Sequence, residues 1–184
     1  MRAAIRPFDP RTILDVGCGS ADIPHALVRE ARRRGGSLHV TCLDASPEVL
    51  EIARRRRQQN SALSFVRGNG SSLPFDDASF DVAMCNLTLH HCDPPSAIAL
   101  LRELRRVARV SALVTDLRRS PAAWTGARIV AALFTRNRLT RHDAPLSVLR
   151  AYTPQEALQL AREAGWRRPA VKRAPFYRMV LIDA

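Results

Sequence analysis

Lysine is almost absent from this sequence. Lys172 is the one lysine among 29 basic residues, which outnumber 17 acidic residues and give a formal net charge of +12. Such a charge is typical of proteins that bind nucleic acid or an anionic surface. An excess made almost entirely of arginine instead indicates a coding bias toward that residue. The runs Arg32-Arg33-Arg34 and Arg54-Arg55-Arg56-Arg57 are expected at helix ends, where cations complement the helix dipole and remain solvated.

Paired cysteines are also lacking. The sequence contains four cysteines and no Cys-x-x-Cys pair: Cys18, Cys42, Cys85 and Cys92. This pattern predicts neither a disulfide framework nor a zinc site, and we expect no metal. Three of the four lie in or beside predicted buried strands or a glycine turn, so free core thiols in a reducing compartment are expected.

Long hydrophobic runs and an N-terminal signal are missing as well. The longest nearly uncharged apolar stretch, residues 121–135, is too short to cross a bilayer, and the N-terminus has no long apolar core. We therefore expect a cytoplasmic protein. The 184 residues, 46% of them hydrophobic, contain no visible linker or repeat, which predicts a single domain over residues 1–184.

The sequence does contain a regular alternation of short apolar runs and helical patterns. The apolar runs predict strands at residues 12–16, 38–43, 62–66, 80–86 and 110–116, and the helical patterns predict helices at 22–34, 47–58 and 94–109. A last helix is expected to start at the capping box Thr153-Pro154-Gln155-Glu156, to bury Ala157, Leu158, Leu160, Ala161 and Ala164, and to end at Gly165. Residues 167–173 and 176–182 predict two closing strands. This order indicates a doubly wound parallel α/β sheet.

The first strand ends in a carboxylate and a glycine turn, Asp15-Val16-Gly17-Cys18-Gly19-Ser20-Ala21. Glycine lets the backbone approach a ligand closely, and the next helix presents its N-terminus there. A dinucleotide fingerprint would need glycine at Asp22, so NAD is not expected. Asp15 is instead placed to accept an ammonium group, and Asp44, after the second apolar run, can bind ribose hydroxyls. The sequence therefore predicts a ligand with an amino-acid end and a ribose.

Four motifs follow one another along the chain: LDVGCGSA, LDASPEVLEIAR, GNGSSLPFDDASFDVAMCNLTLHH and RELRRVARVSALVTDLRRS. In this order they resemble the class I S-adenosylmethionine-dependent methyltransferases, particularly the ubiquinone/menaquinone-biosynthesis methyltransferases, over nearly the whole chain. The resemblance implies a Rossmann-like, doubly wound, seven-stranded sheet of strand order 3-2-1-4-5-7-6, with an antiparallel last strand and helices on both faces. It also implies S-adenosyl-L-methionine as the cofactor.

The resemblance assigns each part of that cofactor to particular residues. The methionine part would meet Asp15, Gly17 and Gly19, the ribose Asp44 with Ala45, the adenine Asn69 with Gly70, and the sulfonium side Asn86 with Leu87. The chain departs from the family at Ala21, which replaces a glycine, and at Asn69, which replaces an aspartate. Asparagine still offers adenine a donor and an acceptor. Because Asn-Gly is also a turn dipeptide, a structural role for Asn69 stays open.

Residues 117–152 form an insertion that the core sheet does not require. Its segment 121–134 is apolar nearly all round, with Arg128 as the single charge, so it is not an ordinary surface helix. We expect the insertion to cover the acceptor pocket, with substrate contacts from Trp124, Phe134 and Arg118. A dimer face, a membrane contact and plain internal packing are the open alternatives. Only eleven residues precede the first strand, so either the insertion supplies the whole lid or an upstream segment is missing.

Methyl transfer to oxygen favours a nearby base, and histidine is the natural one near neutral pH. The catalytic candidates are His142, beside an Asp143 that can orient its ring, and His91, which follows the fourth strand. His90 is a third candidate. A His-His pair at this place often packs structurally in the resembled family, which leaves a structural role open.

Methyl transfer to a small molecule is the predicted function, at the oxygen of a phenol, quinol or polyketide-like aromatic, with carbon methylation open. The alternatives are an RNA or DNA methyltransferase and a non-catalytic cofactor-binding partner subunit. Asp93-Pro94-Pro95 resembles the D-P-P-Y motif of base-methylating enzymes, but it follows the histidines and continues into Ser96 instead of an aromatic residue. A helix cap is therefore favoured there, nucleic acid is not the expected acceptor, and a homodimer stays open.

Overall fold

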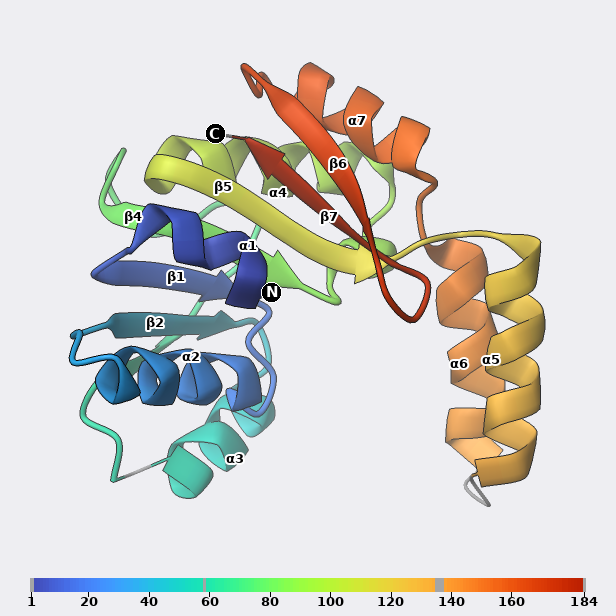
Figure 1. The fold of residues 1–184 in the computed structure, drawn as a ribbon, viewed down its shortest axis with the longest axis horizontal. Coiled ribbons are helices and arrows are strands. Elements are labelled where there is room, and N and C mark those ends of the chain that lie inside the picture. The colour runs from blue at the N-terminus through green and yellow to red at the C-terminus, as the bar shows by residue number, and fades with distance from the viewer. Residues whose placement is uncertain (1, 58, 135–137, 184) are drawn as a thin grey trace.

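The computed structural model describes residues 2–57, 59–134 and 138–183, and the side chains of these ranges except residues 2, 3, 6, 127, 131–134, 138–142 and 144. Figure 1 shows one sheet with helices on both faces and a helix pair at one end. In chain order the elements are α1 (Arg2–Ile5), η1 (Arg6–Phe8), β1 (Thr12–Val16), α2 (Asp22–Arg33), β2 (His39–Asp44), α3 (Pro47–Arg57), β3 (Leu63–Arg67), β4 (Phe80–Asn86), η2 (Leu89–His91), α4 (Pro94–Val107), β5 (Ala108–Leu117), α5 (Pro121–Phe134), α6 (Arg138–Arg150), α7 (Pro154–Glu163), β6 (Pro169–Ala174) and β7 (Arg178–Asp183).

The sheet has the predicted strand order, β3-β2-β1-β4-β5-β7-β6. Strands β1 to β5 pair in parallel, whereas β7 pairs antiparallel with both β5 and β6. The Rossmann-like α/β prediction is therefore confirmed, including the antiparallel last strand. The carboxyl ends of the parallel strands lie at one edge of the sheet, where the strand order reverses between β1 and β4.

Alternate side chains of the strands build a separate core on each face of the sheet. On one face, Leu14 and Cys85 pack with residues of α4 and α7. On the other, Ile13 and Met84 pack with residues of α1, α2 and α3. Cys18, Cys42 and Cys85 are buried and Cys92 partly so, all as free thiols, as the sequence predicts. No helix within the described ranges is long and apolar enough to span a membrane.

Several helix ends follow the sequence signals closely. The Thr153 hydroxyl accepts a hydrogen bond from Glu156 N at 3.3 Å, and the Glu156 carboxylate accepts one from Thr153 N at 2.8 Å, which completes the predicted capping box of α7. Of the residues predicted to be buried in this helix, Leu158 is only partly so. Asp93 caps α4 through a bond from Ser96 N to its Oδ1 at 3.1 Å, which confirms a helix cap at the Asp-Pro-Pro sequence.

Other boundaries differ from the prediction by one or two residues. The helix expected to end at residue 109 ends at Val107, and β5 begins at once because Ala108 has extended backbone angles. The last strand begins at Arg178 because Phe176 and Tyr177 both have positive φ and form the turn before it. Helix α6 was not predicted, since Pro145 lies inside it and proline disfavours a helix interior. Gln58, the expected last residue of the second helix, lies outside the described residues.

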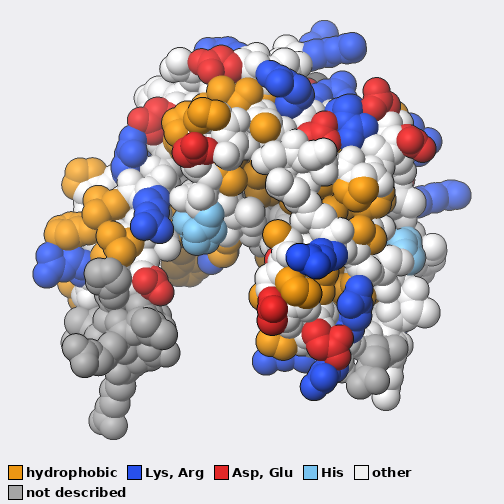
Figure 2. Space-filling model, turned by 180° about the vertical axis from the view of Figure 1, so that it is seen from behind, with side chains coloured by type: hydrophobic (Ala, Val, Ile, Leu, Met, Phe, Trp, Pro, Cys, Tyr) orange, Lys and Arg blue, Asp and Glu red, His pale blue; other side chains and the backbone are white. Residues whose placement is uncertain are grey.

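Helices α5 and α6 pack against each other and stand beyond the carboxyl ends of the strands (Figure 1). Helix α6 also packs against η2, which follows β4. From behind, Figure 2 shows a hollow between this helix pair and the part of the body built by α2 and α3. The described part of the insertion thus lies at one side of the hollow at the carboxyl edge.

Candidate functional site

The glycine turn after β1 is held against its neighbours on both sides. Gly17 N and Cys18 N donate hydrogen bonds to the Leu43 carbonyl oxygen of β2, at 2.8 and 3.1 Å. Gly17 has φ of 72°, and a Cβ added there would lie 2.4 Å from the Thr88 hydroxyl oxygen, which follows β4. Only glycine fits this position. Ala21, where the family has glycine, also has left-handed geometry with φ of 56°, at a cost of about 1 kcal/mol for a residue with a side chain.

Asp15 lies under this turn, almost fully buried, and its Oδ1 has no hydrogen-bond partner among the described atoms. Burial, and secondarily the nearby Asp44 carboxylate, raises the pKa of Asp15 to about 8. A buried carboxylate oxygen without a partner is costly, and a cation bound beside it would relieve that cost. We call Asp15, Asp44 and the glycine turn of residues 17–19 the cradle. The cradle fits a ligand that brings an ammonium group to Asp15, as the expected cofactor would.

Asp44 is positioned by two backbone donors. Its Oδ2 accepts from Gly19 N at 3.1 Å, and its Oδ1 accepts from Ser46 N at 3.1 Å. Both oxygens keep a lone pair for further donors, because a carboxylate has about four acceptor sites. The partly exposed carboxylate at the end of β2 can therefore accept two adjacent hydroxyl groups. Ala45, next to it, is exposed.

Asn69 and Gly70 lie on the same edge. The Asn69 side chain accepts a hydrogen bond from Ser71 N at 3.0 Å, so the turn role of this residue is present, while its exposed amide group keeps donors for a ligand. A Cβ added to Gly70 would lie 3.0 Å from both Val16 at the end of β1 and Leu100 of α4. Glycine is thus needed for this loop to lie against β1.

Asn86 and Leu87 complete the edge at the end of β4. Asn86 is partly exposed, and Leu87 has φ of 54° with its N–H bonded to the Thr115 carbonyl oxygen at 2.8 Å. The structure thus brings the predicted cofactor-binding residues to one edge of the sheet. No cluster of three metal-ligating side chains occurs in the described part of the chain.

A buried histidine and a buried aspartate form a pair beside this edge. The Asp116 carboxylate accepts from His90 Nδ1 at 2.7 Å and from His90 N at 3.0 Å, while Leu117 N bonds to the same carboxylate at 2.6 Å. Because a carboxylate only accepts, the bond assigns the proton of a neutral His90 ring to Nδ1 and leaves the lone pair on Nε2. This is the arrangement of a histidine base oriented by an acid.

His90 lines a cavity of about 460 Å³ between η2, α4 and the chain that joins α6 to α7. The residues that line it are His90, His91, Cys92, Asp93, Pro94, Arg119, Arg150, Tyr152 and Glu156. The Tyr152 hydroxyl donates to the Cys92 carbonyl oxygen at 2.8 Å and so ties the end of the insertion to η2. Figure 2 shows histidine at the rim of the hollow.

The other catalytic candidates are less well placed or lie outside the described side chains. His91 is largely exposed and its ring centroid lies 4.0 Å from that of His90. Partial desolvation of the ring, and secondarily the His90 ring beside it, lowers the pKa of His91. The side chains of His142 and Phe134 are not described. The sequence indicated His90 as a candidate base and a strand that ends at residue 116, but we did not predict from it that His90 and Asp116 meet. His90 follows β4 and Asp116 lies near the end of the adjacent parallel strand β5, which was the signal that could have predicted the pair.

The two remaining substrate candidates each stack on another residue. The Arg118 guanidinium lies 5.9 Å from the ring centroid of Tyr177, and the Arg128 guanidinium lies 4.8 Å from that of Trp124. Arg119 lines the cavity beside His90, and neither Arg118 nor Trp124 is among its lining residues. The structure therefore places Arg118 and Trp124 on the insertion but not against His90.

The arginine runs do end helices α2 and α3, as predicted, but not all of them are solvated. Arg57 is 18% exposed and forms an ion pair with Asp22, whereas Arg55 pairs with Glu51 at 2.8 Å on the open surface. Burial and three arginines, Arg57 foremost, lower the pKa of the neighbouring His25.

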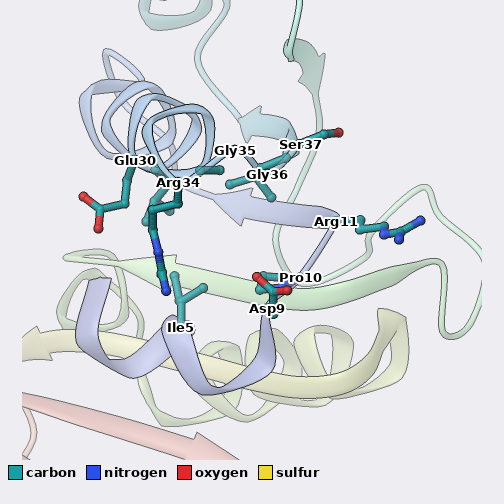
Figure 3. A pocket seen from close by; sticks show the side chains of 12 residues that line it. Ile5, Asp9, Pro10, Arg11, Glu30, Arg34, Gly35, Gly36 and Ser37 are labelled. Atoms are coloured by element: carbon teal, nitrogen blue, oxygen red, sulfur yellow. The ribbon is translucent and has the colours of Figure 1, made fainter.

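A larger cavity, of about 670 Å³, lies at the opposite edge of the sheet, between α1 and α2 (Figure 3). Its lining includes Arg11 and Leu38, which precede β1 and β2. Parallel sheets bind ligands at the carboxyl ends of their strands, so this cavity is separate from the candidate site.

Known proteins resemble both the sequence and the fold. A family model for a methyltransferase domain matches residues 13–111, more than half of the chain. A demethylmenaquinone methyltransferase of Staphylococcus epidermidis is 34% identical over 107 residues, 58% of this chain and 42% of that protein. One from Thermotoga maritima is 28% identical over 175 residues, 88% of this chain and 72% of that protein. The chain thus spans less than half the length of the Staphylococcus relative.

The fold also matches solved structures. A SAM-dependent methyltransferase from Aquifex aeolicus superposes with a TM-score of 0.71 and 17% identity, over 98% of this chain and 87% of that chain. Human N-acetylserotonin methyltransferase, solved in complex with SAM, gives a TM-score of 0.71 and 16% identity over 98% of this chain and 49% of that chain.

Proposed function

Because this chain belongs to the methyltransferase-domain family, as a class I S-adenosylmethionine-dependent methyltransferase, we propose that it methylates a hydroxyl oxygen on a small apolar acceptor. The acceptor class is a phenol, quinol or polyketide-like aromatic. The observation that carries this proposal is the buried His90–Asp116 pair at the carboxyl edge, beside the cradle of Asp15 and Asp44.

The cofactor would be held by the residues that surround the glycine turn. Asp15 would bind the ammonium group, Asp44 the ribose hydroxyls, and Asn69 the adenine edge. When bound, S-adenosylmethionine supplies an activated methyl group, so the protein needs chiefly to orient the acceptor and remove its proton. Gly17 lets the turn lie against Thr88 and Gly70 lets its loop lie against β1, so the backbone that would surround the cofactor is packed against the protein.

His90 would remove the acceptor proton at Nε2, because its Nδ1–H is bonded to Asp116. Asp116 acts as a positioning residue that fixes the ring and stabilises the imidazolium once it forms. Burial of the pair excludes water and strengthens the interaction between the two groups. Methyl transfer to a hydroxyl oxygen benefits from such a base, because the hydroxyl proton must be removed. We therefore favour oxygen over carbon as the acceptor atom.

An apolar acceptor is supported by the insertion and by the relatives. Helix α5 offers apolar bulk beside the hollow. Trp124 and Phe134 of this helix, and Arg118 before it, are the proposed substrate contacts. Both relatives described above are named demethylmenaquinone methyltransferases, and another, from Erwinia pyrifoliae, is named a malonyl-[acyl-carrier protein] O-methyltransferase. Those names favour a small or carrier-bound molecule over nucleic acid.

The test is turnover of a panel of phenols and naphthols whose hydroxyl pKa values span about 6 to 10, with the His90→Gln and Asp116→Asn variants. Both variants should lose turnover by roughly 10²-fold or more on the least acidic hydroxyls, since these need a base. The loss should shrink toward none for hydroxyls already ionised at the assay pH, because no proton remains to be removed.

His39→Gln is the matched control, since this exposed histidine begins β2 at the opposite edge of the sheet and should keep full turnover. Equal losses across all acceptors would show that His90 has a structural role. Full activity of His90→Gln together with a loss in His91→Gln would move the base to His91.

A further inference from the structure

The turn between β6 and β7 exposes two aromatic residues. Phe176 is 89% exposed and Tyr177 is 44% exposed. Both have left-handed backbone geometry, with φ of 58° and 54°. Turns of this kind favour glycine, asparagine or aspartate, because other side chains are strained there. Neither backbone geometry nor hydration favours an aromatic residue at these positions.

Contacts with the rest of the protein fix this turn in place. Arg118 N donates to the Tyr177 carbonyl oxygen at 2.8 Å, and the Arg118 guanidinium lies 5.9 Å from the Tyr177 ring centroid. The Tyr177 ring also approaches Gly126 of α5, where an added Cβ would lie 3.9 Å from it. Phe176 is thus exposed on a turn whose position is fixed by contacts of its neighbour Tyr177.

The apolar surface continues from the turn onto α5. One helical turn beyond Gly126, Ile129 and Val130 are 53% and 56% exposed. We call Phe176, Tyr177, Ile129 and Val130 the tip surface. Exposed apolar side chains that gather in this way mark a contact with another molecule or with a membrane.

Positive charge lies beside the tip surface. Residues 170–182, which include the turn and the strands on either side of it, contain no aspartate or glutamate and three cationic residues: Lys172, Arg173 and Arg178. Lys172, Arg173 and Arg178 are exposed in the hairpin strands. In the register, Arg178 pairs with Ala174 and Arg173 with Met179, so cations flank the turn on both faces of the hairpin.

We propose that the tip surface docks on an anionic lipid surface, with Phe176 inserted among the headgroups. An exposed aromatic residue beside aliphatic residues, flanked by Lys and Arg, matches the layered polarity of such a surface. Nucleic acid fits less well, because Ile129 and Val130 offer no ring on which bases can stack. A second copy of this chain fits less well too, because the cations flanking the turn on both faces would meet like charge at a two-fold contact. The inference does not rest on the proposed methyl transfer.

The test is co-sedimentation of the whole chain with vesicles. Binding to vesicles of phosphatidylglycerol and phosphatidylcholine should exceed binding to pure phosphatidylcholine and should weaken as salt is added. Phe176→Ser should lower the partition coefficient by about tenfold or more, because one inserted aromatic side chain is lost. Ile52→Ser is the matched control, since Ile52 is 49% exposed on α3, and this variant should partition like the unaltered protein.

Three outcomes would overturn the proposal. The first is equal partition of the two variants, which would mean that charge alone drives binding. The second is tighter, Phe176-dependent binding to a single-stranded oligonucleotide than to the vesicles. The third is a dimer, seen by gel filtration, that Phe176→Ser dissociates and whose formation abolishes vesicle binding.

Discussion

Single carboxylates decide what the cradle at the carboxyl edge can hold. Asp15 is buried with one oxygen unpaired, which suits a cationic group, whereas Asp44 is partly exposed and already fixed by two N–H donors, which suits hydroxyl groups. The two aspartates also repel each other, and this repulsion adds to the raised pKa of Asp15. A ligand that brings a positive charge to Asp15 and hydroxyl groups to Asp44 would pair the buried Asp15 oxygen and reduce the repulsion between the two carboxylates.

Replacing Asp44 with alanine tests the ribose assignment. Asp44→Ala should weaken the binding of S-adenosylhomocysteine by about 1.5 to 3 kcal/mol, the range for hydrogen bonds to a charged group. Isothermal titration calorimetry measures this difference. Glu51→Ala, on the exposed surface of α3, is the control and should leave affinity unchanged. Equal affinity of Asp44→Ala and the unaltered protein would remove Asp44 from the ligand site.

Elements with strong local signals could be predicted from the sequence, and those without them could not. The capping box of α7 and the Asp93 cap of α4 were predicted because each cap uses residues within three positions of one another. Helix α6 was not predicted because its interior proline disfavours a helix and its charged residues obscure any apolar helical pattern. The His90–Asp116 pair was missed because its partners are 26 residues apart and meet only through the register of β4 and β5.

Removing the cap of α7 tests how much this capping hydrogen bond stabilises the folded protein. Thr153→Ala should lower the free energy of unfolding by about 1 kcal/mol, since Glu156 N loses its acceptor. Urea denaturation measures the change. Thr125→Ala is the control, because the exposed Thr125 hydroxyl bonds only back to the Pro121 carbonyl oxygen within α5. An equal decrease in the free energy of unfolding of both variants would mean that the capping bond stabilises the protein no more than the Thr125 hydroxyl bond does.

The whole molecule carries a net charge of +12, but not all of its arginines are free to bind an anion. Some are paired, as Arg57 is with Asp22 and Arg106 is with Glu103 and Asp77. We therefore expect tRNA and duplex DNA to bind only weakly at about 0.15 M salt and to accept no labelled methyl group. Filter binding and a methyl-transfer assay check this. Saturable tight binding with methyl incorporation would contradict the small-molecule assignment.

We propose that the carboxyl edge of the sheet binds the amino-acid end of the cofactor through Asp15. With a pKa of about 8, Asp15 is mostly protonated in the free protein at pH 7, and a bound ammonium group favours the ionised form. Binding should therefore release a proton at pH 7, and affinity should fall as the pH drops below 8.

The most direct measurement is calorimetric titration of S-adenosylhomocysteine at pH 7 in two buffers of different ionisation enthalpy. The unaltered protein should bind and release close to one proton, and Asp76→Asn, an exposed control, should behave in the same way. Asp15→Asn should bind more weakly and release none. No binding heat from the unaltered protein, or release of as many protons by Asp15→Asn as by the unaltered protein, would show that Asp15 does not bind the ammonium group.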